Sequence, residues 1–183
     1  MSNWYKEIEW SETLSQGDIF FNLPVVLPAP IIDDSDPYNI KEINSIVENL
    51  DVVILTQACD LETKGVETVV LAPLYDPLEI EIANSNRWGF IAEVHAGRRA
   101  NYALIGKHEG SIITNYKIVD FSQMFSMQYD YINNFRPHHG QRLRLNTPHR
   151  ELLSQQFGNY FSRIGLPNED FINKVKLRAD LGL

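Results

Sequence analysis

The hydrophobic residues of this chain fall mainly in short runs separated by polar or turn-forming residues, a pattern typical of β-strands. The most apolar run, Val52–Leu55, is rich in β-branched residues and is bounded by Asp51 and Thr56. A short run of this kind indicates a central buried strand. Residues 67–72 form a second run that stops at Pro73, and we expect it to pair with the first.

Other short runs predict strands at residues 19–21, 88–94, 101–105, 111–119 and 142–145. Residues 28–48 contain several prolines and the acidic stretch Asp33–Asp36. This composition predicts an inserted surface loop, with a short helix from Ile40 to Asn49. Many short strands with turn signals between them favour a mainly β fold with some α, built as a small barrel.

The C-terminal part changes to a helical periodicity, which predicts an amphipathic helix with Thr147 as its N-cap and Pro148 as its first residue. A second helix is expected from Asn168. The predicted organisation is therefore a β-barrel over residues 1–146 and a helical tail over residues 147–183 that packs on it. The apolar face of the first helix comprises Leu153, Phe157, Tyr160, Phe161 and Ile164.

Charge is unevenly distributed along the chain. The 183 residues, 44% of them hydrophobic, suit one domain with its own core, and the net charge of −8 argues against a general nucleic-acid binder. Residues 1–133 carry 8 Lys/Arg against 20 Asp/Glu, whereas residues 134–183 carry 8 against 4. The basic tail docks on the acidic body, is simply solvated, or forms a local anion or nucleic-acid patch.

The single cysteine, Cys59, allows no intrachain disulfide and therefore favours a reducing, cytoplasmic location. The N-terminus lacks the features of a signal peptide, and no stretch approaches about 18 uninterrupted apolar residues. We expect no membrane association.

The segment Thr56–Asp60 places several polar groups just after the central strand, where scaffolds often present reactive residues. One hypothesis makes Cys59 a nucleophile, with Gln57 as an oxyanion donor and a histidine as its base. Asp60 is the alternative reactive group. The competing interpretation is that Cys59 is a small buried hydrophobe and Asp60 a turn cap.

The adjacent pair His138 and His139 supplies the candidate histidines. Two neighbouring histidines do not form a metal site without further ligands. We therefore predict no metal site and no cofactor.

A cationic region follows this histidine pair. In a strand, Arg142 and Arg144 would point to the same face, with a spacing that suits two phosphates. The predicted anion or nucleic-acid contacts are Arg136, Arg142, Arg144, His149 and Arg150, with Arg98 and Arg99 as additional candidates.

The order of motifs resembles the PemK/MazF family of small-barrel toxins. The chain has Gly17-Asp18-Ile19, then Val52–Thr56, then Val69–Pro73, and finally residues 115–120 at the places of the corresponding family strands. The resemblance covers roughly residues 16–125. It implies an SH3-like barrel, a bacterial cytoplasmic protein of the toxin-antitoxin or phage-defence type, and often a dimer.

The family's RNA-cleaving members have an Arg before the apolar strand, where this chain has Asn49-Leu50-Asp51, and a Thr or Ser where it has Leu74-Tyr75. The resemblance therefore implies a toxin-like or defence-associated module that contacts nucleic acid or a partner protein without the usual ribonuclease activity. More narrowly, the chain is similar to bacterial proteins with an S/T-Q-x-C-D motif. A Cys/His-dependent hydrolase or nuclease and a protein-interaction subunit are the alternatives.

Overall fold

The computed structural model describes residues 3–33, 36–63, 65–82, 86–108, 110, 112–113, 115–135 and 142–162, with side chains undescribed over residues 28–43. Its elements are β1 (Tyr5–Ile8), β2 (Asp18–Asp33), β3 (Asp36–Ile54), α1 (Ala58–Glu62), β4 (Thr68–Tyr75), α2 (Arg87–His95), β5 (Tyr102–Ile105), β6 (Lys117–Asp120), the 3-10 helix η1 (Phe121–Gln123), β7 (Phe125–Gln128), α3 (Tyr129–Asn134), β8 (Arg142–Leu145) and α4 (His149–Phe161). The protein is mainly β with a few helices, as predicted.

The strands form an antiparallel sheet in the order β1-β8-β2-β3-β4-β6-β5, with β7 also paired to β4. No backbone pairing closes this path between β1 and β5 within the described residues. The two ends nevertheless meet through side chains. The buried hydroxyl of Tyr5 donates a hydrogen bond to the carbonyl of Gly106 at 2.6 Å, and a Cβ at Gly106 would collide with the indole of Trp4. The sheet therefore curls without closing.

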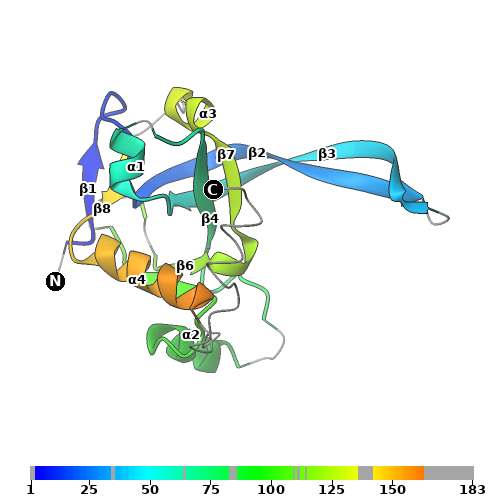
Figure 1. Ribbon diagram of the computed structural model, residues 1–183. Coiled ribbons are helices and arrows are strands. Elements are labelled where there is room, and N and C mark those ends of the chain that lie inside the picture. Colours follow the sequence, from blue (N-terminus) through cyan, green and yellow to red (C-terminus); the bar gives the residue numbers. More distant parts are fainter. Residues whose placement is uncertain are drawn as a thin grey trace, which may run out of the picture.

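Two hydrophobic clusters form the main core on either side of the central strands. The predicted central strand is confirmed, because Val52, Val53 and Ile54 are all fully buried in β3 and pair with residues 71–73 of β4. One cluster includes Leu153 of α4, and the other includes Leu61 of α1 together with residues of α3. Figure 1 shows these helices around the curled sheet.

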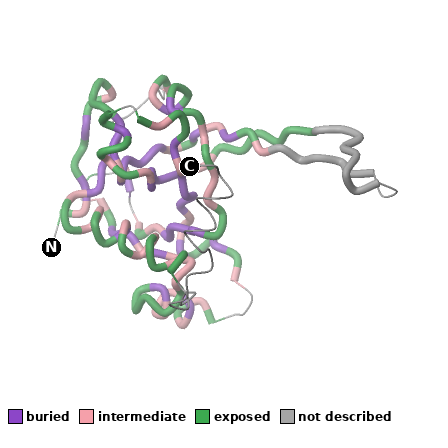
Figure 2. Tube along the Cα trace, in the orientation of Figure 1, coloured by how far each residue is buried: buried purple, intermediate pink, exposed green. Residues whose placement is uncertain are grey.

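The region predicted as an inserted loop is instead part of a long hairpin. Strands β2 and β3 run on to Asp33 and Asp36, so the helix expected over residues 40–49 is wrong. Their outer parts project from the body as a two-stranded arm (Figures 1 and 2). Cross-strand pairing in a nearly continuous register outweighs the local turn and helix signals here.

The strand predicted at residues 88–94 is also wrong, since these residues lie in α2. The side chain of Asn86 accepts a hydrogen bond from the backbone N–H of Gly89 and caps this helix, which buries Phe90 and Val94 four residues apart. The strands predicted at 101–105 and 142–145 are confirmed as β5 and β8. Of the described residues between 111 and 119, the last three belong to a strand, β6.

The predicted C-terminal helix is confirmed as α4, although its N-cap is Pro148 and not Thr147. The Thr147 hydroxyl lies 3.1 Å from a carboxylate oxygen of Glu151 instead. Ile164 and the second predicted helix lie outside the described residues. Within the part of the chain that is described, no helix has the length and apolar character needed to cross a membrane.

Candidate anion-binding hollow

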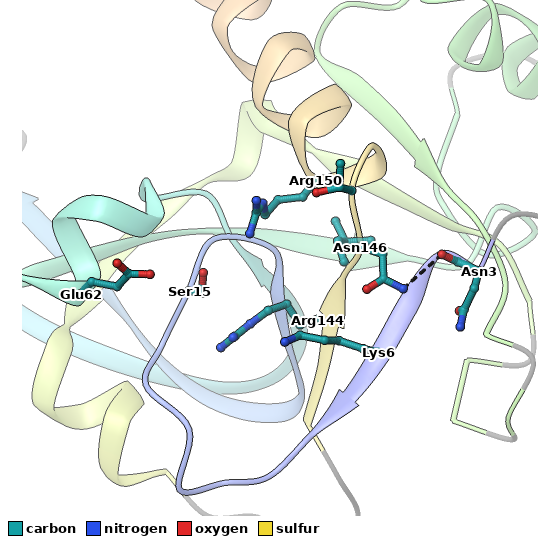
Figure 3. Close-up of a pocket in the computed structure, with 9 residues that line it drawn as sticks. Asn3, Lys6, Ser15, Glu62, Arg144, Asn146 and Arg150 are labelled. Atoms are coloured by element: carbon teal, nitrogen blue, oxygen red, sulfur yellow. Dashed lines mark hydrogen bonds between the residues drawn. The ribbon is translucent and has the colours of Figure 1, made fainter.

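An open hollow of about 500 Å³ lies where β1, β8, α1 and the start of α4 come together. Figure 3 shows Lys6 from β1, Arg144 from β8 and Arg150 from α4 around it, with Glu62 of α1 on the opposite rim. The amide side chains of Asn3 and Asn146 also line it. Three cations from three different elements therefore face one polar space.

Strand pairing explains why these groups meet. Lys6 is the register partner of Arg144 across β1 and β8, and Arg144 is in turn the partner of Asp18 across β8 and β2. Side chains of directly paired residues lie on the same face of a sheet. The row Lys6, Arg144, Asp18 therefore runs across three strands that are far apart in the sequence.

Arg144 is fixed by a buried ion cluster. Asp18 is fully buried, and its carboxylate accepts a hydrogen bond from Nε of Arg144. Nη2 of the same arginine lies 3.0 Å from Asp18 Oδ2. Arg142, with 1% of its surface exposed, places Nε 3.3 Å from the same oxygen. Both guanidinium groups also donate to backbone carbonyls of residues 12 and 13. Arg144 Nη1 also lies 3.4 Å from a carboxylate oxygen of Glu12, which is partly exposed. The two guanidinium groups therefore meet one buried and one surface carboxylate.

Burial raises the pKa of Asp18, while the guanidinium groups of Arg144 and Arg142 act in the opposite direction. The prediction that Arg142 and Arg144 share a face is confirmed, since both reach Asp18. Arg142 nevertheless lies inside the protein and holds Asp18, so its side chain does not offer a surface contact for phosphate.

The Gly17-Asp18-Ile19 motif has a local structural reason. Gly17 has φ +82°, and a Cβ there would lie 3.1 Å from the Cβ of Leu145 and 3.3 Å from Arg150. Only glycine adopts this backbone geometry easily. Asp18 then enters the ion cluster, and Ile19 enters the core with no exposed surface. The motif thus joins β2 to both β8 and the hollow.

Lys6 and Arg150 are held more loosely than Arg144. Lys6 Nζ lies 3.9 Å from Glu12 with half of its side chain exposed, and Arg150 Nη2 lies 2.7 Å from Glu151 at the surface. Exposed ion pairs of this kind contribute only about 0 to 1 kcal/mol. A bound anion can therefore replace these carboxylates at small cost.

His149 lies beside the hollow but is not a cationic contact. Its ring stacks on Trp4 with centroids 3.7 Å apart and an interplanar angle of 12°. Its Nε2 atom is buried and has no hydrogen-bond partner among the described residues. Burial lowers the pKa of His149, so the ring is neutral near pH 7.

The Cys59 segment borders the same region through Glu62, three residues further along α1. Cys59 is exposed, so the interpretation as a buried hydrophobe is wrong. Its Sγ lies 3.7 Å from the Gln57 amide oxygen and 3.6 Å from Asp60 Oδ1. No histidine of the described part of the chain is among these hydrogen-bonding contacts.

The remaining predicted site residues fall elsewhere. Arg136, His138 and His139 lie outside the described residues. Arg98 and Arg99 follow α2 at the surface, where Arg99 Nε lies 2.6 Å from Glu93. Arg99 lines a second hollow and not the one at Arg144.

Sequence reasoning missed several members of the hollow, above all Lys6, Asp18 and Glu62. The Gly-Asp-Ile motif was the one available signal for Asp18. Lys6 and Glu62 carry no local signal, because they reach the site through strand order and through the position of α1. Within the described ranges, no group of three or more His, Cys, Asp or Glu side chains is placed to hold a metal ion.

No family model matches the chain, and no curated protein or solved structure matches it either. The similarity to PemK/MazF proteins stays a prediction.

Proposed function

We propose that this protein is a toxin-like or defence-associated bacterial module, located in the cytoplasm, that contacts single-stranded nucleic acid through the hollow at Arg144. One observation carries this proposal: Lys6, Arg144 and Arg150 converge on a single open space from three elements. Cationic grooves with amide donors are a common way to hold a phosphate backbone.

The net charge of −8 means that nucleic acid would be repelled from most of the surface. We expect contact at the hollow, because its two outer cations, Lys6 and Arg150, pair only with surface carboxylates and exchange partners easily. Glu62 on the rim limits the affinity, since it repels phosphate. We therefore expect weak, strongly salt-dependent binding.

The PemK/MazF resemblance supports the class of protein, and the curled sheet whose ends meet at Tyr5 and Gly106 is compatible with a barrel of that type. The positions of the family's catalytic residues carry structural groups instead. Asp51 pairs with Lys117 at 3.4 Å, and Leu74 is buried with 5% of its surface exposed. These contacts favour nucleic-acid binding without the family's RNA cleavage.

The test is fluorescence anisotropy with a labelled single-stranded RNA, at about 50 and 200 mM salt. We expect binding at the lower salt, steep loss at the higher salt, and intact RNA on a denaturing gel. The double variant Lys6→Ala/Arg150→Ala should bind at least about tenfold more weakly, because two phosphate contacts are removed.

Arg98→Ala/Arg99→Ala is the matched control, because it removes two exposed cations outside the hollow. It should change binding only slightly. An equal loss in both double variants would show a general charge effect, and no binding at low salt would overturn the proposal.

A further inference from the structure

The arm exposes apolar side chains without any cover within the described residues. Val26, Ile46 and Val47 are 58%, 52% and 64% exposed. From Leu50 outward to the tip, these strands pair only with each other within the part of the chain that is described. Figure 2 shows that the described part of this ribbon, next to the body, is mostly exposed. A two-stranded ribbon is only marginally stable in water, and further strands would stabilise it.

The two edges of the arm are chemically different. Strand β2 carries Pro24, Pro28 and Pro30, all at even-numbered positions. Their backbone nitrogens therefore point toward the same edge of the strand. Proline lacks an N–H and is tolerated in a paired strand where its nitrogen points away from the partner. Three outward-facing positions of β2 are therefore blocked by prolines, a common protection of edge strands.

The register identifies the outward-facing positions of β3. Residues 24, 26, 28 and 30 pair with Asn49, Val47, Ser45 and Ile43. In an antiparallel pair, both residues of a non-hydrogen-bonded pair direct their backbone groups outward. These four β3 residues thus present N–H and C=O groups along an edge that, among the described residues, pairs with β4 at residues 52–54 alone. The prolines therefore hinder pairing of another strand with the β2 edge of the arm, whereas the β3 edge is open to such pairing.

We propose that this open β3 edge pairs with the same edge of a second copy of the chain, antiparallel about a two-fold axis at Ile46. In this register Ser45 lies opposite Val47 of the other copy. Residues whose backbone N–H and C=O groups point out of the arm therefore lie opposite each other, as hydrogen bonding between the copies requires. Asn44 faces Glu48, which places an amide opposite a carboxylate. A two-fold contact of this kind closes on itself.

The register also brings the exposed Ile46 side chains of the two copies together. Leu27 is the partner of Ile46 within each arm, so the dimer has a continuous row across four strands: Leu27, Ile46, then Ile46 and Leu27 of the second copy. A two-fold axis at residue 45 would instead bring Glu48 opposite position 42, a glutamate in the sequence. Like charges directly opposite one another destabilise a sheet.

The charge of the arm excludes nucleic acid as its occupant. Residues 24–49 contain five Asp or Glu and one Lys. The dimer therefore goes beyond the proposed contact at the hollow and uses a separate surface.

The first test removes the outward N–H groups. Ser45→Pro/Val47→Pro blocks the β3 edge but leaves the pairing with β2 intact, because residues 45 and 47 belong to non-hydrogen-bonded pairs, as Pro24, Pro28 and Pro30 do on β2. The matched control is Val26→Pro, on the edge that is already blocked. By sedimentation equilibrium we expect a wild-type dimer, at least about tenfold weaker dimerisation of the double variant, and an unchanged dimer in the control.

A second variant covers the case in which the prolines unfold the arm. Ile46→Lys places two ammonium groups against each other at the two-fold axis, at a position exposed enough to tolerate lysine in the monomer. It should also abolish the dimer. RNA binding at the hollow should stay unchanged in both variants, so failure of the dimer and failure of the nucleic-acid proposal are distinguishable.

Amide hydrogen exchange gives an independent test, because the expected protection alternates from residue to residue along β3. Dimerisation should slow the amides of residues 43, 45, 47 and 49 more than those of residues 44, 46 and 48, which already bond to β2. A wild-type protein that stays monomeric at all concentrations, or a dimer that survives both edge variants, would overturn the proposal.

Discussion

The inner and outer halves of the β2–β3 hairpin contain similar apolar residues in opposite environments. In the inner half, Ile19 and Val53 form a pair with no exposed surface. In the outer half, Val26 and Val47 form a pair that is 58% and 64% exposed. The difference comes from neighbours: the inner half has β8 and β4 beside it and core residues on its faces. Among the described residues, the outer half has no further strand beside it, and only Val25 and Leu27, close to the body, pack with the core. A run of apolar β-branched residues therefore predicts a strand, but it does not predict whether other elements bury that strand.

The inner half also anchors the hollow. Asp18 begins β2 and holds two arginines of β8, so the same strand pair that supports the core positions Arg144 at the surface. The outer half offers backbone edges and isolated apolar side chains instead. Stability is concentrated at one end of the hairpin, and the proposed self-association belongs to the other.

The largest expected effect is from Asp18→Asn. The substitution leaves two buried guanidinium groups without their carboxylate, so unfolding free energy should fall by about 3 to 5 kcal/mol in urea denaturation. The matched control is Asp51→Asn, which removes the charge from a partly exposed pair with Lys117. A loss below about 1 kcal/mol is expected there. Similar losses in both variants would contradict the view that the buried cluster anchors the inner half.

The next effect compares two isoleucines on the same strand. Ile54→Ala removes a fully buried side chain from the core and should lower the unfolding free energy by about 2 to 5 kcal/mol. Ile46→Ala removes a half-exposed side chain from the arm and should change it by less than about 0.5 kcal/mol. Thermal or urea unfolding of both variants measures the difference directly. Comparable losses would mean that the arm is part of the cooperative core.

The smallest expected effect is the contribution of His149 to the pH dependence of the unfolding free energy. Because burial lowers the pKa of His149 below its ordinary value of 6.5, the unfolded chain takes up its proton first as pH falls. The associated stability is present above pH 6.5 and is lost as pH falls through the lowered pKa of the folded state. His149→Phe should retain stacking on Trp4 and reduce this loss, by an amount well below the effect of Ile54→Ala.

Unfolding free energies of wild type and His149→Phe between pH 7.5 and 5 would measure this difference. Dimerisation through the arm should not follow it, since His149 lies in the body. A pH dependence that is the same in both proteins would assign it to other groups.

Much of the fold was predictable from local sequence. The apolar run at Val52 and its pairing with the run before Pro73 give a strong signal, because a short β-branched stretch is buried most easily in a sheet. The periodicity of the C-terminal helix was equally informative. The errors at residues 40–49 and 88–94 have a common reason, since short segments of mixed composition take the structure that their tertiary partners and caps favour.

The candidate site was predicted only in part. Arg144 and Arg150 were found as cations in a dense stretch, and their shared environment with Lys6 depends on strand order. The same stretch contains Arg142 and His149, whose sequence signals are indistinguishable from those of Arg144 and Arg150. Burial separates them: Arg142 points into the ion cluster, and His149 lies against Trp4.

The sequence by itself determined the mainly β composition, the central strand, the C-terminal helix and the position of the basic region. These features depend on local periodicity and residue type, which the chain carries in each short segment. Only the tertiary structure decided which cations face a common hollow, that Cys59 is exposed, and that one edge of a long hairpin stays open. These features depend on which distant strands become neighbours, because burial and charge pairing are properties of that arrangement and not of any single segment.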